Sequence, residues 1–62
     1  MVVRLTGKTN HGKNRVRENG IEWEVVNKDN GAGRWVLKSI TTGDLRNVHP
    51  TEDKDFIMEV PT

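Results

Sequence analysis

Residues that favour turns recur along this chain at intervals too short for a long helix. Glycine, an Asn-Gly pair or proline occurs near positions 7, 12, 20, 31, 43 and 50, and the runs between them are rich in Val, Ile, Trp and Thr. An apolar stripe of helical spacing does not continue across these glycines for more than about two turns. The pattern is typical of several short strands in a small all-β sandwich or barrel.

Alternating hydrophobicity locates the predicted strands. Ile21, Trp23 and Val25 alternate with two glutamates, so one face of this strand should be buried and the other solvated. The preceding connection, residues 6–18, is predicted to be a loop whose end at 14–17 is extended and joined to the next strand by an Asn-Gly hairpin at 19–20. Residues 41–44 form a second predicted tight turn. The expected strands are residues 2–5, 21–25, 34–40, 45–48 and 56–60.

Length and composition limit the chain to one small domain, residues 1–62, with a small core. Because cysteine is absent, disulfides and thiolate metal sites are excluded, and no apolar run is long enough for a transmembrane helix or a signal peptide. We therefore expect a cytoplasmic protein without a membrane partner, either a monomer or a weak homodimer that gains burial by association. The predicted core residues are Val3, Leu5, Trp23, Val25, Leu37, Val48, Phe56 and Met58.

The order of these elements resembles the SH3-like barrel over nearly the whole chain. Residues 6–20 take the place of its long first loop, 27–33 of its second loop, 41–44 of its distal hairpin and 49–52 of its short 3₁₀ turn. The resemblance implies an all-β fold: a single SH3-like barrel of five to six short antiparallel strands, with one short 3₁₀ turn before the last strand. Residues 7–17, followed by Trp23-Glu24-Val25, also resemble short uncharacterised open reading frames of phage and marine metagenomes, which imply no function.

The chain departs from peptide-binding SH3 domains in the residues that those domains use. They bind proline-rich helices in a groove of exposed aromatic side chains, beside an acidic first loop. This chain has no tyrosine, and its first loop carries lysine and arginine in place of acids. Recognition of proline-rich peptides in that manner is therefore not expected.

The residue types that catalysis and metal binding require are scarce. Ser39 is the single serine, and His11 and His49 are the only histidines. Two histidines without cysteine do not complete a zinc site, and a domain of this size has little room for a closed pocket. Residues 52–55 are interpreted as a solvated acidic turn. The sequence thus predicts no enzyme, no catalytic residues, no metal site and no cofactor.

Basic residues are concentrated in the first part of the chain. Residues 1–17 contain five bases and no acid, whereas residues 51–62 contain four acids and one base. Either the two ends neutralise each other, or the basic segment attracts an anionic partner. The candidate binding residues are Lys8, Lys13, Arg15, Arg17, Arg34 and Trp35.

The sequence leaves open whether the Trp35 side chain is exposed or packs into the core. In its strand, Trp35 and Leu37 lie on one face and Val36 and Ile40 on the other, so one of the two sets must be at least partly exposed. An exposed tryptophan beside cations could stack on a base or anchor a peptide; otherwise it packs inward.

Two functions therefore remain open for a non-enzymatic binding module. The first is protein interaction or assembly, with Trp35 and the strand edge at Ile57 as contacts. The second is nucleic-acid binding, with the basic residues on phosphates and Trp35 stacked on a base. Arg15 and Arg17 could instead serve to keep a strand edge from aggregating.

Overall fold

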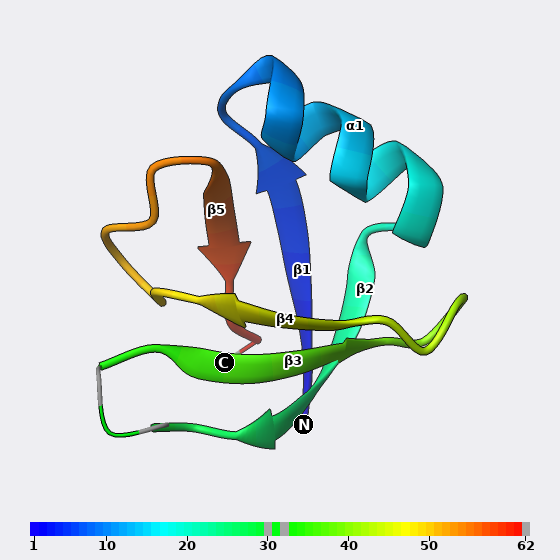
Figure 1. Ribbon diagram of the computed structural model, residues 1–62. Helices are drawn as coiled ribbons and strands as arrows, with labels where there is room; N and C mark the ends of the chain where they lie inside the picture. Colours follow the sequence, from blue (N-terminus) through cyan, green and yellow to red (C-terminus); the bar gives the residue numbers. More distant parts are fainter. Residues whose placement is uncertain (30, 32, 62) are drawn as a thin grey trace.

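The computed structural model describes residues 1–29, 31 and 33–61, which form one curled sheet and one helix. The sheet has the strand order β4-β3-β2-β1-β5 with antiparallel neighbours throughout, so β4 and β5 are its free edges. It curls so strongly that β3 and β4 cross in front of β1 (Figure 1). The fold is a small all-β half-barrel, consistent with the predicted SH3-like class. The strands are β1 (Val2–Gly7), β2 (Glu22–Asn27), β3 (Trp35–Ser39), β4 (Leu45–Val48) and β5 (Phe56–Glu59).

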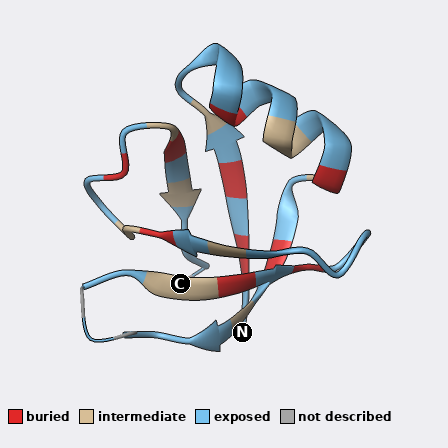
Figure 2. Ribbon diagram, viewed as in Figure 1, coloured by how far each residue is buried: buried red, intermediate tan, exposed pale blue. Residues whose placement is uncertain are grey.

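The hydrophobic core fills the concave face of the sheet. Directly opposed residues of neighbouring strands lie on the same face, as Val3 and Trp23 do. Trp23 is fully buried, and its indole Nε1 donates a hydrogen bond to the Gly20 carbonyl at 3.0 Å. Figure 2 shows buried residues along β1, β2 and β3. Every predicted core residue is confirmed: Val3, Leu5, Trp23, Leu37, Val48 and Phe56 are buried, and Val25 and Met58 pack against them.

The convex face of the sheet carries opposite charges on neighbouring strands. Arg4 of β1 is opposite Glu22 of β2 and Glu59 of β5, and Glu24 of β2 is opposite Lys38 of β3. Opposite charges at such positions stabilise a sheet modestly. This face therefore combines charges of opposite sign on neighbouring strands with the exposed apolar side chains of Val2, Leu45 and Ile57.

A helix, α1 (Asn10–Asn19), occupies the segment between β1 and β2. The Thr9 hydroxyl caps its first turn by accepting a hydrogen bond from the Gly12 amide at 3.1 Å. Gly20 ends it with a φ of 84°, and its amide donates to the Val16 carbonyl at 2.7 Å. The predicted loop, its extended segment at 14–17 and the hairpin at 19–20 are therefore wrong.

Gly12 explains why the sequence pattern did not indicate this helix. A glycine inside a helix costs about 1 kcal/mol relative to alanine, which argues against a helix here. A Cβ atom at Gly12, however, would lie 2.0 Å from the Asp55 carbonyl oxygen, and one at Gly7 would lie 2.3 Å from the Lys13 nitrogen. The two glycines let α1 lie directly against the end of β1 and against the β4–β5 connection, so packing outweighs the local preference.

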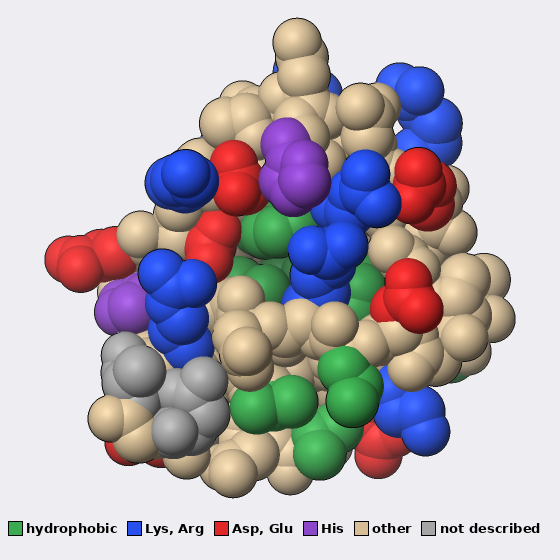
Figure 3. Space-filling view, in the orientation of Figure 1, with side chains coloured by type: hydrophobic (Ala, Val, Ile, Leu, Met, Phe, Trp, Pro, Cys, Tyr) green, Lys and Arg blue, Asp and Glu red, His purple; other side chains and the backbone are tan. Residues whose placement is uncertain are grey.

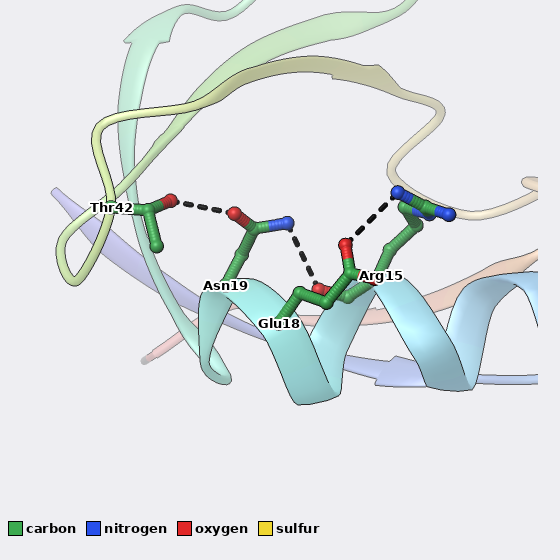
Figure 4. Close-up of polar contacts among 4 residues, drawn as sticks. All are labelled: Arg15, Glu18, Asn19 and Thr42. Carbon is green, nitrogen blue, oxygen red and sulfur yellow. Dashed lines mark hydrogen bonds and ion pairs between the residues drawn. The ribbon is translucent and has the colours of Figure 1, made fainter.

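A buried polar cluster joins the end of α1 to the β3–β4 turn (Figure 4). The Asn19 side chain is buried; its Nδ2 donates to the Arg15 carbonyl at 3.0 Å, and its Oδ1 accepts from the Thr42 hydroxyl at 2.6 Å. The Ser39 hydroxyl donates to the Asn19 carbonyl and accepts the amides of Thr41 and Thr42. These hydrogen bonds fix the end of the helix against the sheet.

The connections between strands follow the prediction at two places. In the β3–β4 turn, Gly43 adopts a φ of 82° and its amide donates to the Ser39 carbonyl at 2.9 Å. A second turn lies at residues 50–52, between β4 and β5. No helix in the described part of the chain has the length and apolar character needed to cross a membrane.

Candidate binding site at the mouth of the half-barrel

A pocket of about 500 Å³ lies where the half-barrel stays open, between β4 and the segment that leads into β5. We call this pocket the mouth. It is lined by residues 45–47 of β4 and residues 52–56 of the opposite wall, with His11 from the start of α1 and Arg34 from the residue before β3. Figure 3 looks onto this side of the molecule, where hydrophobic side chains lie at the bottom of a hollow surrounded by charged and histidine side chains.

The free edge of β4 forms one wall of the mouth. Leu45, Arg46 and Asn47 all line it, although consecutive side chains of a strand point to opposite faces. Leu45 is opposite Lys38 on the convex face and is 63% exposed. The strand backbone must therefore contribute to the wall. A free edge presents N–H and C=O groups that no neighbouring strand satisfies.

Arg46 lies on the core-facing side of β4. It is opposite Leu37 and two residues before Val48, and both of these residues are fully buried. Because opposed residues share a face, the guanidinium belongs to the concave side, where it lines the mouth. It is half-buried, and no ion pair joins it to any residue that the structure describes. Arg46 is not among the binding residues predicted from the sequence, although the alternation that buries Val48 also turns Arg46 inward.

Two of the three acidic residues of the opposite wall, Asp53 and Asp55, have partners within the chain. The Asp53 carboxylate is nearly buried and accepts three backbone amides of neighbouring residues, at 3.0 to 3.2 Å. The Asp55 carboxylate accepts a hydrogen bond from the Thr9 hydroxyl at 2.8 Å. Glu52 is exposed. The interpretation of this segment as a solvated acidic turn is therefore wrong for Asp53, which is a structural residue that holds the turn together.

The His49 side chain stabilises the turn at the beginning of the same wall. Its Nδ1 accepts the amides of Thr51 and Glu52 at 3.1 and 2.9 Å, which requires an Nδ1 without a proton. The imidazole thus organises the turn as an Asn or Asp side chain often does. Among the described residues, no three His, Cys, Asp or Glu side chains gather in the way that a metal site needs.

Two of the predicted basic residues are engaged in contacts within the domain. The Lys8 Nζ donates to the Asp53 carbonyl at 2.9 Å, which ties the end of β1 to the β4–β5 connection. Arg15 forms an ion pair with Glu18 at 3.0 Å on α1 (Figure 4). Their charges are therefore less available to a phosphate backbone than the sequence suggested.

The other predicted residues lie on separate parts of the surface. Lys13 and Arg17 are exposed about one turn apart on α1, whereas Arg34 lines the mouth. Trp35 is half-buried opposite Val48 and packs against the core, and the Lys28 Nζ lies 5.7 Å from the centre of its ring. A cation at this distance from an aromatic ring is weakly attracted to it. The structure therefore brings one of the six predicted residues, Arg34, to the mouth.

The fold and the site define a class of protein: a small all-β half-barrel with a polar pocket between the edge strand β4 and the segment that leads into β5. Comparison of the chain with protein-family models, with curated proteins and with solved structures finds no match. The functional assignment therefore rests on the residues of the mouth.

Proposed function

We propose that this protein is a non-enzymatic binding module for protein interaction or assembly, and that it holds an extended segment of a partner protein in the mouth. The observation that supports this proposal is the position of the mouth along the free edge of β4. An added strand gains main-chain hydrogen bonds from a free edge, and neighbouring side-chain pockets make the binding selective.

The composition of the mouth favours a protein segment over nucleic acid. A phosphate backbone is bound by an excess of lysine and arginine, whereas a protein interface combines an apolar centre with a rim of mixed polarity. Phe56 supplies an apolar surface in the mouth. The charged residues around it are balanced in number: Arg34, Arg46 and Lys54 against Glu52, Asp53 and Asp55.

A displayed library of random linear peptides tests the proposal. Peptides retained by the wild-type protein are synthesised and titrated into the isotope-labelled chain. We expect saturable shifts of the amide signals of residues 45–47 and 52–56, with the convex-face signals of Arg4 and Glu24 unchanged. Failure to retain any peptide, or shifts confined to the convex face, would contradict the proposal.

Nucleic-acid binding is the second candidate function, and the exposed pair Lys13 and Arg17 on α1 favours it. If α1 binds nucleic acid, a mixed-sequence oligonucleotide should shift the amide signals of α1 at about 0.15 M salt. The affinity should fall steeply as salt rises, because bound phosphates release counterions. A double variant, Lys13→Ser with Arg17→Ser, should abolish those shifts without unfolding the domain. A flat titration of the wild-type chain eliminates this candidate.

A further inference from the structure

We infer that the partner segment is acidic: an extended stretch of protein with an Asp or Glu carboxylate that Arg46 binds inside the mouth. The inference rests on the proposed function and adds the chemistry of the partner. It depends on three observations, which are the position of Arg46, the hydrogen bonds of the neighbouring acids and the exposure of Leu45.

Arg46 is the first observation. Among the described strand residues that share a face with the core, it is the only charged one. A guanidinium that is partly removed from water without a counter-ion loses hydration and gains no charge partner in exchange. A carboxylate supplies that partner in the best geometry, because the planar guanidinium can donate two parallel N–H···O bonds to it.

The neighbouring acids do not fill this role from within the chain. Asp53 directs its carboxylate at backbone amides, and Asp55 accepts from the Thr9 hydroxyl. Glu52 is exposed at the rim and forms no ion pair among the described residues, so Arg46 is left without a carboxylate partner from within the chain. Arg34 adds a second guanidinium to the lining, without an ion pair among the described residues.

Strand geometry then defines the pattern of the partner. In a segment paired with the edge of β4, the residue opposite Arg46 points to the concave side, and its two neighbours point to the convex side. One of those neighbours lies beside Leu45, which is 63% exposed. The preferred segment therefore carries a carboxylate next to an apolar residue that covers Leu45.

Reversing the charge of Arg46 tests directly whether the partner segment is acidic. The same peptide library is selected on the wild-type protein, on Arg46→Glu and on Lys13→Glu, which makes the same change in net charge on α1, outside the mouth. We expect Asp and Glu to be enriched in peptides selected by the wild type and by Lys13→Glu. Arg46→Glu should lose this enrichment and select Lys and Arg instead.

A second variant, Arg46→Gln, gives the quantitative measurement. A charge-assisted hydrogen bond is lost, so a selected acidic peptide should bind about tenfold to a hundredfold more weakly. Thermal unfolding of each variant establishes that it is folded. If Arg46→Glu does not fold, Arg46→Gln decides the question, because glutamine keeps a polar, though shorter, side chain and introduces no charge of the opposite sign.

The outcomes separate this inference from the proposed function. Selected peptides that bind in the mouth without acidic enrichment, or with equal affinity for Arg46→Gln, overturn the acidic partner and leave the binding function in place. If the wild type retains no peptide, both proposals fall. If an oligonucleotide shifts the Arg46 side-chain signals and acidic peptides do not, the ligand of the mouth is nucleic acid and not a protein segment.

Discussion

Gly12→Ala is a substitution for which local preference and tertiary packing predict opposite signs. In an isolated helix the change stabilises by about 1 kcal/mol. In this domain the new Cβ would lie 2.0 Å from the Asp55 carbonyl oxygen and 2.9 Å from the carbonyl carbon. Both are backbone atoms, so no side-chain rotation can relieve the contact. The helix and the β4–β5 connection must move apart.

The magnitude follows from what that movement disturbs. Overpacking of closely packed elements costs about 1–3 kcal/mol. The Asp55 carbonyl also accepts the Lys8 amide at 2.7 Å, and loss of such a hydrogen bond costs about 1 kcal/mol more. After the helical gain is subtracted, Gly12→Ala should destabilise the domain by about 1–3 kcal/mol, which lowers its Tm by roughly 4–24 °C.

Thermal and urea unfolding followed by circular dichroism measure this effect. Asn14→Ala is the matched control, because Asn14 is exposed on the same helix and alanine there should stabilise by a few tenths of a kcal/mol. If Gly12→Ala raises the Tm as the control does, the close packing of α1 against Asp55 is refuted.

Two further predictions concern polar residues that hold the ends of elements. Asn19→Ala should lower the free energy of unfolding by about 1–3 kcal/mol, because it leaves the Thr42 hydroxyl without its acceptor; an unchanged urea midpoint would contradict the role of this cluster. His49→Ala should cost about 1 kcal/mol through loss of the acceptor for two turn amides. His49→Asn should recover most of that stability, because an Asn side chain can accept the same amides, and equal losses in the two variants would show that Nδ1 is not the group that matters.

The strands and the core were predictable because alternation is a local property of the chain. Trp23 and Val25 are separated by Glu24, and the structure places them on the concave face. Leu37 and Val48 follow the same rule in β3 and β4. Arg46 follows the same alternation, so its position on the core-facing side of β4 could have been predicted from the sequence. It was overlooked because a charged residue is not usually considered for the face of the core.

The helix was not predictable in the same way. Val16 is its main apolar contact with the core, and Gly12 opposes helix formation locally. What stabilises α1 is a cap at Thr9, a buried amide at Asn19 and close approach of the backbone to Asp55. Of these, only the cap leaves a sign in the sequence, since Thr is a common residue at that position.

Periodicity by itself determined that this chain forms a small all-β fold with Trp23 at its centre, because each strand shows which of its faces is buried. Tertiary structure alone decided that α1 lies between β1 and β2, that Asp53 is buried and that Arg34 and Arg46 meet at one pocket. These features depend on contacts between residues far apart in the chain, such as Thr9 with Asp55 and Lys8 with Asp53. No local pattern records such contacts, since they form only once β5 has paired with β1 and α1 has packed against the β4–β5 connection.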